Sequence, residues 1–577
     1  MFLVPRLGCR ELSKGVANLR VAVTVVRKTT NAPGIITSGL QDVEIPTIPL
    51  DEFVLDKSGI WDARVAVECV VTGRNYTYSQ LRTKSKNFGS SLRKKLKLQK
   101  NDVIAMLLPN VPEFPIVALG AIRAGLICTT INPLYTPEEI ARQLTDSSAK
   151  VIITLNDFWP LARAAVQSTK TDIPVLTVDT KQGQSTPAGA INFSEFTDNA
   201  VDFPRAATSS EDVIFLPYSS GTTGLPKGVQ LTHSNIVSNI CQLHHPELNL
   251  FRETTADYQE VCPAVLPMFH IYGLTVLCWN LLSLGIKITT LPKFEPEMYI
   301  KSLRKYKPST LYVVPPIAIF LAKHPAVKPE DLDSVEYLIN GAAPLGKLDE
   351  EELIKKANRD IAVLQGYGLT ETSPAVLTIW PNMKKMPGIE GALGLPLANT
   401  QVKLVAIDDP TGTPLGPNQT GELLVKGPQV MKGYLNRPKE NEETFLDGWL
   451  RTGDMMYYND EGFLFITDRL KELIKVKGFQ VAPAELEEIV RNFPDVTDAA
   501  VIGVPDPKVG EVPRVYIVTR PGAKIDFDKL NEHVNSKVAN YKQLKGGICV
   551  IDSIPKNATG KILRRELKMI YEKENSS

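Results

Sequence analysis

Residues 212–233 read DVIFLPYSSGTTGLPKGVQLTH, and this stretch decides what kind of fold the chain has. A short apolar run at residues 213–216 leads into a loop that is rich in hydroxyl groups and glycine. The loop residues are Ser219, Ser220, Gly221, Thr222, Thr223, Gly224, Leu225, Pro226, Lys227 and Gly228. Glycine allows close backbone approach, while hydroxyls and a lysine donate hydrogen bonds to an oxyanion. The pattern predicts a loop that binds a phosphate-rich ligand such as a triphosphate.

Two familiar nucleotide-binding loops do not fit this stretch. A Walker A loop has Gly before its Lys and Ser or Thr after it, whereas Pro226 precedes Lys227 here and Gly228 follows it. No G-x-G-x-x-G sequence follows a strand candidate, so a dinucleotide-binding fold has no support. The plain alternative is a polar surface turn, which the length of the loop and its attachment to a buried strand disfavour.

Apolar runs of strand length alternate with helical patterns over most of the chain. The strand candidates are residues 103–108, 126–131, 151–154, 175–178, 213–216, 310–314 and 337–340. Residues 112–124 have a helical pattern. Strands separated by helices predict parallel sheets, so we expect a large α/β N-terminal domain with two α/β sheet subdomains.

The pattern of predicted secondary structure changes twice towards the C-terminus. From about residue 394, the runs 402–407, 421–426 and 462–467 lie between turn clusters and predict a β-rich subdomain. After residue 468, helical patterns at 484–492 and 527–538 and strand patterns at 499–504 and 515–518 predict a small α+β C-terminal domain. We therefore divide the chain into a basic segment at 1–40, a large domain at 41–468 and a small domain at 469–577.

Composition excludes several classes of protein. Of the 577 residues, 43% are apolar and 22% charged, which is typical of globular chains and not of fibrous or disordered ones. Lys plus Arg total 65 against 64 for Asp plus Glu, so overall charge gives no reason to expect a nucleic-acid partner. The seven cysteines include no CxxC pair, which argues against a disulfide framework or a structural zinc site.

Residues 261–286 form an uncharged, mostly apolar run of the length of a membrane span. Pro263, Pro267, His270 and Gly273 would place breaks and polar groups inside the hydrocarbon. We expect a buried strand, a loop around His270 and a buried helix at 274–284, and no membrane span.

Six further motifs follow the phosphate loop along the chain. They are LPMFHIYG (266–273), NGAAPL (340–345), QGYGLTE (365–371), WLRTGD (449–454), DRLKELIKVKGFQVAPAE (468–485) and IPKNATGKILRR (554–565). Together with YSSGTTGLPKG (218–228), they resemble, in sequence and order, the signatures of the adenylate-forming superfamily. That superfamily holds acyl-CoA synthetases, 4-coumarate–CoA ligases, firefly luciferase and peptide-synthetase adenylation domains. The chain resembles most the 4-coumarate–CoA ligase-like acyl-CoA synthetases.

The resemblance implies a role for each motif. The residues implied to bind ATP or AMP are Ser219, Ser220, Gly221, Thr222, Thr223, Gly224, Lys227, Gln365, Gly366, Tyr367, Thr370, Asp454 and Arg469. Those implied to line the acyl pocket are His270, Tyr272, Gly341, Ala342, Ala343 and Gly366. Tyr367 would stack on adenine, Asp454 would accept the ribose hydroxyls, and Glu371 would contact Mg²⁺.

The resemblance also implies a two-step reaction. A carboxylic acid and ATP would give acyl-AMP and pyrophosphate, and CoA would then take the acyl group. The implied catalytic residues are Lys561, His270, Thr370 and Glu371. The small domain would be mobile, turning about Lys471 so that Lys561 serves adenylation while Lys475, Lys477 and Gly478 serve thioester formation. We therefore expect ATP, CoA and Mg²⁺ as cofactors, and we leave the oligomeric state open.

Several alternatives remain at this point. We expect a fatty acid as the substrate, with an aromatic, coumarate-like acid as the alternative. A luciferase-like oxygenase is a second alternative, although Asn239 and Pro374 replace an Arg and a Ser that luciferases carry. A module that loads a carrier protein would need a carrier domain, and none follows Lys561. An inactive nucleotide-binding protein would be expected to lack charged motif residues that this chain keeps.

Charge is unevenly distributed along the chain. Residues 1–40 contain six basic residues and one acidic residue, so this segment carries +5 and the rest carries −4. Its arginine spacing and hydroxyl groups predict a mitochondrial transit peptide, with a basic arm on a cytosolic enzyme as the alternative. The C-terminal residues do not form a Ser-Lys-Leu peroxisomal signal.

Overall fold

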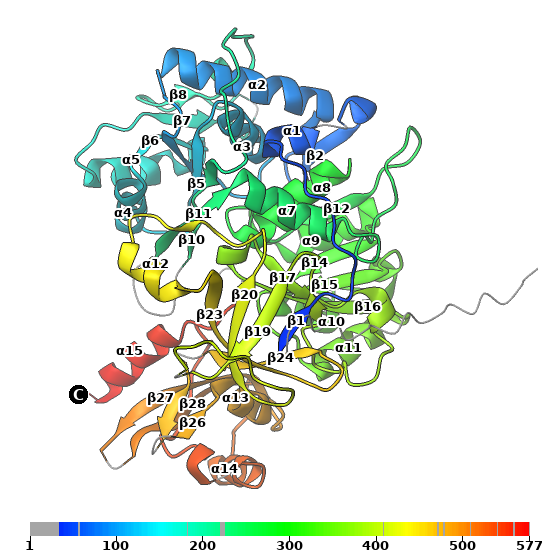
Figure 1. Cartoon of the computed structure of the whole chain (residues 1–577), viewed down its shortest axis with the longest axis vertical. Coiled ribbons are helices and arrows are strands. Elements are labelled where there is room, and N and C mark those ends of the chain that lie inside the picture. Colours follow the sequence, from blue (N-terminus) through cyan, green and yellow to red (C-terminus); the bar gives the residue numbers. More distant parts are fainter. Residues whose placement is uncertain are drawn as a thin grey trace, which may run out of the picture.

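The computed structural model describes residues 34–55, 58–181, 183–219, 226–407, 409–469, 472–476, 479–507, 509–538, 540–557 and 560–575. A large N-terminal body carries a small C-terminal domain, coloured orange to red, at one end (Figure 1). Most of the predicted targeting segment, residues 1–33, lies outside the described residues.

The first subdomain is built on a sheet in the order β10-β11-β9-β5-β4-β6-β7-β8, with β21 paired to β11. The strands are β4 (Val103–Leu107), β5 (Ile127–Thr130), β6 (Ala149–Leu155), β7 (Val175–Val178), β8 (Ile191–Asn192), β9 (Val213–Phe215), β10 (Tyr218–Ser219), β11 (Lys227–Thr232) and β21 (Gly433–Tyr434). Strands β9, β5, β4, β6, β7 and β8 are parallel. All five residues of β4 are buried, which explains its unbroken apolar run.

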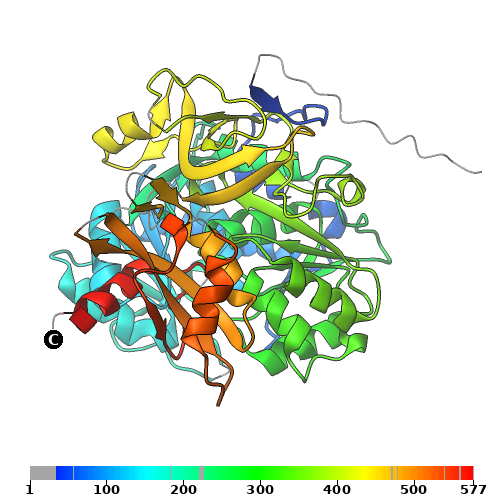
Figure 2. The same ribbon diagram turned by 90° about the horizontal axis from the view of Figure 1, so that it is seen from below.

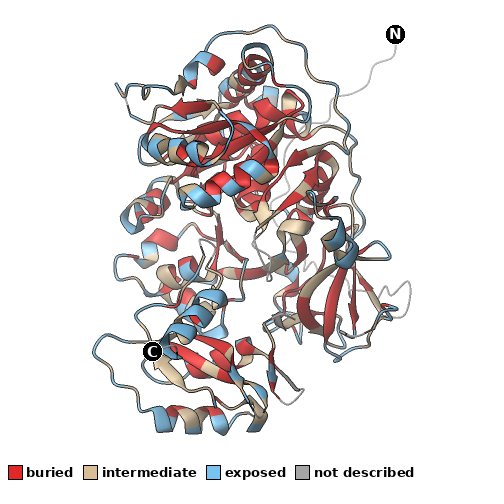
Figure 3. Ribbon diagram, turned by 90° about the vertical axis from the view of Figure 1, so that its left-hand side faces the viewer, coloured by how far each residue is buried: buried red, intermediate tan, exposed pale blue. Residues whose placement is uncertain are grey.

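Helices cover this sheet and connect its strands. They are α1 (Leu50–Leu55), α2 (Tyr78–Lys95), α3 (Glu113–Arg123), α4 (Pro137–Ser147), α5 (Trp159–Ser168), α6 (Ser194–Thr197) and α7 (His233–Leu243). Figure 3 shows buried strands inside and helices with exposed outer faces around them. The prediction of an α/β subdomain with a parallel sheet is confirmed.

The second subdomain contains two sheets, in the orders β12-β13-β2-β3 and β14-β15-β16-β17-β18. The strands are β2 (Val65–Cys69), β3 (Asn75–Thr77), β12 (Val261–Ala264), β13 (Lys287–Thr290), β14 (Thr310–Val313), β15 (Tyr337–Asn340), β16 (Ala362–Gly368), β17 (Ala375–Thr378) and β18 (Leu395–Pro396). Its other helices are α9 (Pro296–Tyr306), α10 (Pro315–Lys323) and α11 (Lys347–Ala357). Strands β14, β15 and β16 are parallel, so the NGAAPL and QGYGLTE motifs leave one edge of the sheet together.

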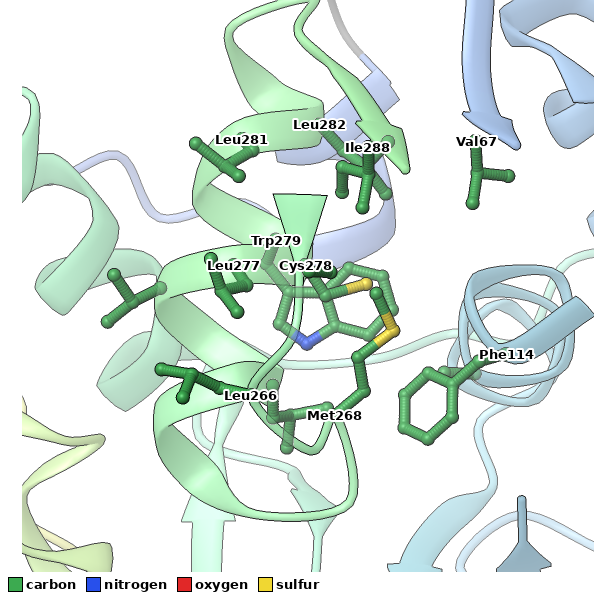
Figure 4. Close-up of a cluster of buried hydrophobic side chains, with 14 of the residues drawn as sticks. Val67, Phe114, Leu266, Met268, Leu277, Cys278, Trp279, Leu281, Leu282 and Ile288 are labelled. Carbon is green, nitrogen blue, oxygen red and sulfur yellow. The ribbon is translucent and has the colours of Figure 1, made fainter. Parts of the chain in front are cut away.

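The uncharged run at 261–286 lies in the core. It forms β12, a π-helix at Tyr272–Trp279 and α8 (Asn280–Ser283). Figure 4 shows Met268, Cys278 and Trp279 packed in one apolar cluster with Phe114. The predicted buried strand and helix are confirmed, although the π-helical geometry was not predicted. In the described part of the chain, no helix combines the length and apolar character that a membrane span needs.

The β-rich subdomain is a sheet in the order β1-β19-β20-β23-β22, with β24 paired to β23. Its strands are β1 (Ile35–Thr37), β19 (Gln401–Val405), β20 (Gly421–Lys426), β22 (Phe445–Leu446), β23 (Trp449–Tyr458) and β24 (Leu464–Arg469), and α12 (Pro438–Thr444) lies beside it. Residues 35–37 pair with residues 401–403. The predicted boundary at residue 40 therefore falls inside the folded body, because a three-residue strand is too short to stand out in an apolar pattern.

The C-terminal domain has its own hydrophobic core. Its sheet has the order β26-β25-β28-β27 with β29 paired to β28. The elements are β25 (Ile474–Val476), β26 (Phe479–Val481), α13 (Pro483–Arg491), β27 (Val496–Asp506), β28 (Gly510–Thr519), α14 (Phe527–Asn535), β29 (Ile548–Val550) and α15 (Arg564–Asn575). Two apolar clusters draw only on residues 474–571. Seen from below, the domain lies across one end of the N-terminal body (Figure 2).

Candidate active site

The phosphate loop is the tip of a β-hairpin. Ser219 on β10 lies opposite Lys227 on β11, and Tyr218 lies opposite Gly228. The residues at the tip that were predicted to bind phosphate, Ser220, Gly221, Thr222, Thr223 and Gly224, lie outside the described residues. The hairpin places the hydroxyl of Ser219 and the ammonium of Lys227 at the base of the same loop.

Glu371 joins this loop to the QGYGLTE motif. The residue lies in a 3₁₀ turn, Thr370–Thr372, that follows β16. Ser219 Oγ donates a hydrogen bond of 2.9 Å to Glu371 Oε1, and the hydroxyl of Tyr434 donates one of 2.8 Å to the same oxygen. Thr370 therefore lies next to a carboxylate that contacts the base of the phosphate loop.

The surroundings of Glu371 fit its predicted contact with Mg²⁺. Both hydrogen bonds that it accepts from described residues reach Oε1, which leaves Oε2 available as a hard oxygen ligand. Across the described ranges, no three His, Cys, Asp or Glu side chains gather as a metal site. A Mg²⁺ ion at Glu371 would therefore take its remaining ligands from phosphates and water, as Mg²⁺ commonly does.

The predicted adenine and ribose residues also come together. The hydroxyl of Tyr367, on β16, donates a hydrogen bond of 2.6 Å to Asp454 Oδ2, on β23. Asp454 is only 1% exposed, so this donor stabilises a nearly buried carboxylate. The backbone of Arg469 lies opposite Asp454 in the β23–β24 register. Tyr367 and Asp454, which are 87 residues apart in sequence, thus meet at one edge of the site, with the backbone of Arg469 beside Asp454.

Gln365 has a role that sequence reasoning did not predict. Its Nε2 donates to the carbonyl of Leu345 at 3.1 Å, and its Oε1 accepts from Asn340 Nδ2 at 3.2 Å and from the backbone N–H of Leu345 at 3.3 Å. These bonds fix both ends of the NGAAPL loop. Gln365 therefore positions the loop that carries Gly341, Ala342 and Ala343.

Two of the residues predicted to line the acyl pocket, Gly341 and Tyr272, lie against each other. A Cβ on Gly341 would lie 2.8 Å from Cε1 of Tyr272, so only glycine admits the ring at this distance. The hydroxyl of Tyr272 donates to the carbonyl of Ile339 at 3.2 Å, and its ring meets Tyr312 edge-on at 6.4 Å. Ala342 is exposed with φ +67°, a left-handed conformation that is uncommon for alanine and typical of functional loops.

His270 and Lys561 lie near each other although they come from different domains. Burial of the ring and, to a smaller degree, the Lys561 ammonium lower the pKa of His270 to about 4, so the ring is neutral at pH 7. A Cβ on Gly560 would lie 2.9 Å from Pro316 at the start of α10, so the loop that carries Lys561 packs closely on the N-terminal body. The structure brings Lys561 to the acyl side of the site.

Of the residues predicted to serve thioester formation, the structure describes only Lys475. Lys475 lies on β25 with an exposed side chain, and its backbone N–H donates to Glu511 at 2.9 Å. Lys471, Lys477 and Gly478 lie outside the described residues. The arrangement described here thus pairs His270 with Lys561, the residue predicted to serve adenylation.

Sequence reasoning missed Tyr434. This tyrosine contacts Glu371 through its hydroxyl, and its ring centroid lies 5.1 Å from the Nζ of Lys227. The signal in the sequence is weak, since it is a single aromatic residue in the turn-rich stretch MKGYLNRP at 431–438. The pairing of β21 with β11 and these two contacts show that it belongs to the site.

The fold and this collection of residues define a ligase that activates a carboxylic acid with ATP. Residues 61–435 match the AMP-binding enzyme family, and residues 485–561 match the AMP-binding enzyme C-terminal domain. The chain belongs to this family of adenylate-forming enzymes.

Individual relatives cover nearly the whole chain. It is 38% identical to 4-coumarate–CoA ligase 2 of Nicotiana tabacum over 92% of this chain and 96% of that protein. It is 39% identical to 4-coumarate:CoA ligase 1 of Petunia hybrida over 94% of this chain and 97% of that protein. The crystal structure of ATP-bound MatB from Rhodopseudomonas palustris superimposes with a TM-score of 0.79 at 26% identity, over 91% of this chain and 99% of that one.

These findings confirm the predicted class of enzyme. The protein is an AMP-forming acid–CoA ligase that uses ATP, CoA and Mg²⁺ and takes a small carboxylic acid as substrate. The predicted superfamily, fold class and cofactors are likewise confirmed.

Proposed function

We propose that the acid activated by this ligase is aromatic, of the 4-coumarate type. The observation that carries the proposal is the similarity to 4-coumarate–CoA ligases at 38–39% identity over more than nine-tenths of the chain. The fatty acid that we expected from the sequence gains no support from these relatives. The aromatic acid, our alternative, becomes the proposed substrate.

The acyl side of the site has features that suit a planar ring. Tyr272 and Tyr312 provide aromatic edges and faces, which favour offset or edge-on contact with another ring. Gly341 lets Tyr272 approach the NGAAPL loop. A Cβ on Gly366 would lie 3.7 Å from the carbonyl oxygen of Leu377, its nearest atom among the described residues, so these residues leave room for a methyl group at this position. We assign the space beside Gly366 to the substrate ring.

The first half-reaction joins the acid to AMP. A carboxylate oxygen attacks the α-phosphorus of ATP, and the bond to the pyrophosphate oxygen breaks. Donors fixed in advance towards the charge that develops are usually the largest catalytic contribution. We assign Thr370 and Lys227 to the phosphates and Lys561 to the carboxylate and the α-phosphate. Glu371 would hold Mg²⁺, which when bound neutralises part of the phosphate charge.

The second half-reaction transfers the acyl group to CoA. The thiol sulfur attacks the acyl carbonyl and loses its proton to solvent, and the bond to AMP breaks so that AMP leaves with the electron pair. We propose that the small domain, residues 469–577, turns about Lys471 so that Lys475, Lys477 and Gly478 replace Lys561 at the site. The exposed side chain of Lys475 and the position of Lys561 beside His270 support this alternation.

A panel of acids tests the proposed substrate. ATP–pyrophosphate exchange and CoA thioester formation would be measured with 4-coumarate, benzoate, octanoate and palmitate. We expect the highest kcat/KM for 4-coumarate in both assays. A higher value for octanoate or palmitate would refute the aromatic assignment and restore the fatty acid.

We also propose that the enzyme is mitochondrial, with the cytosol as the alternative. The support is the +5 charge of residues 1–40 and their low acidic content. A fluorescent reporter fused to residues 1–40 should enter mitochondria, and a diffuse cytosolic signal would refute the proposal.

A further inference from the structure

The segment 431–435 is joined by its backbone to two parts of the site. On β21, Gly433 pairs with Gln230 and Tyr434 pairs with Val229 of β11, the strand that begins at Lys227. The backbone N–H of Met431 donates to the carbonyl of Glu371 at 2.8 Å. The position of this segment is therefore fixed relative to both the phosphate hairpin and the Glu371 turn.

The side chain of Tyr434 contacts one charged group of each part. Its hydroxyl donates 2.8 Å to Glu371 Oε1, and its ring centroid lies 5.1 Å from Lys227 Nζ, within the range of a cation–π contact. Ser219 Oγ donates to the same carboxylate oxygen at 2.9 Å. Two donors on Oε1 fix the rotation of the carboxylate and so determine where Oε2 lies.

The helix after β21 fixes the tyrosine itself. Asn441 of α12 accepts a hydrogen bond from the N–H of Tyr434 at 2.7 Å and donates one to its carbonyl at 3.0 Å. Glu440, one residue earlier, places Oε1 3.9 Å from Lys227 Nζ. In Figure 1, α12 lies beside β10 and β11, in agreement with these contacts. Backbone and side-chain bonds thus hold the ring where it meets Lys227.

We propose that Tyr434 is a positioning residue for both charged groups of the phosphate site. Its hydroxyl orients Glu371 so that Oε2 faces the Mg²⁺ of the nucleotide, and its ring holds Lys227 towards the phosphates. The proposal rests on the roles proposed above for Glu371 and Lys227. It predicts that the hydroxyl and the ring have separable effects.

Two substitutions separate these effects. Tyr434→Phe removes the donor to Glu371 and keeps the ring beside Lys227, so the Mg²⁺ concentration for half-maximal ATP binding should rise about tenfold, while ATP binding without Mg²⁺ should not change. Tyr434→Leu removes the ring as well and should also weaken ATP binding without Mg²⁺. Calorimetric titration of ATP at a series of Mg²⁺ concentrations measures both the Mg²⁺ dependence of ATP binding and ATP binding without Mg²⁺.

A matched control is available outside the site. Tyr258 also donates its hydroxyl to a carboxylate, Glu260 Oε1, at 2.6 Å. Tyr258→Phe should leave the Mg²⁺ dependence unchanged, and thermal unfolding would show that each variant is folded. Because Tyr434→Phe changes a single atom of a half-buried residue, this variant tests the proposal even where Tyr434→Leu does not fold.

Glu371→Gln distinguishes the two ways in which the proposal can fail. A shift in Mg²⁺ dependence for Glu371→Gln together with no shift for Tyr434→Phe would overturn the role of Tyr434 alone. No shift for either variant would overturn the assignment of Glu371 to Mg²⁺ and the role of Tyr434 with it. A shift for both, with Tyr258→Phe unchanged, is the expected result.

Discussion

The substitution Gly366→Ala tests the placement of the acid most directly. The new Cβ would have the carbonyl oxygen of Leu377 at 3.7 Å and that of Asn340 at 3.9 Å as its nearest protein atoms, which are ordinary contacts. The fold should therefore accept the methyl group. Replacing a strand glycine can even increase the free energy of unfolding, by about 0.4–1 kcal/mol, because the unfolded chain loses freedom.

The same methyl group should interfere with an aromatic acid. Added methyl groups in a filled space cost about 1–3 kcal/mol, which corresponds to roughly a 5- to 150-fold loss of kcat/KM. Spectrophotometric thioester formation with 4-coumarate measures the loss. Unaltered kcat/KM for 4-coumarate in a variant of normal stability would refute the placement of the ring beside Gly366.

Gly341→Ala is the matched comparison. Its Cβ would lie 2.8 Å from Cε1 of Tyr272, so the ring would have to move and its hydrogen bond to Ile339 would be disturbed. We expect a cost of about 1–3 kcal/mol in the free energy of unfolding as well as a loss of activity. Equal effects of the two substitutions on stability would contradict the geometry on which both predictions rest.

Three further predictions follow from the site and its surroundings. Lys561→Ala should lower the rate of acyl-AMP formation by roughly 10²–10³ and spare thioester formation from supplied acyl-AMP; equal losses in the two assays would argue against domain alternation. Asp454→Asn should raise the KM for ATP by roughly tenfold or more in initial-rate assays and leave the KM for the acid unchanged. Burial lowers the pKa of His233 to about 4 from its ordinary 6.5, so the unfolded chain binds this proton more readily. Stability should thus be intact above pH 6.5 and fall towards pH 4, by up to about 3 kcal/mol at 1.36 kcal/mol per pKa unit. Urea unfolding at pH 7 and pH 5 measures this fall in the free energy of unfolding. The fall should be smaller for His233→Asn than for the unsubstituted protein.

Local patterns predicted most of the elements around the site. The strand at 103–108 was found because a parallel, fully buried strand leaves an unbroken apolar run, and those at 175–178 and 337–340 were found because most of their residues are apolar. The short strands β1 and β21 were missed, since three or two residues carry no periodic pattern. These two pair with strands that are distant in the sequence, so no local signal indicates them.

Some features of the candidate site could be predicted from the motifs, and others depend on the tertiary structure. The resemblance of the motifs to the adenylate-forming superfamily pointed to Thr370, Glu371 and Lys561, and a hydroxyl donor and a hard carboxylate oxygen suit the first two roles. The motifs could not indicate that Gln365 uses its amide on Leu345 or that Tyr434 donates to Glu371. Such contacts depend on which loops the fold brings together.

The sequence alone determined the chemical class of this protein. The loop YSSGTTGLPKG with its companion motifs resembles the signatures of the adenylate-forming superfamily, and that resemblance pointed to an enzyme that adenylates a carboxylic acid. The tertiary structure decided which polar groups meet. It brings Lys561 to His270, and it brings Ser219 and Tyr434 to the same oxygen of Glu371. The physical reason is range: propensity and periodicity act over a few residues, whereas Ser219 and Glu371 are 152 residues apart and meet only when the sheets pack.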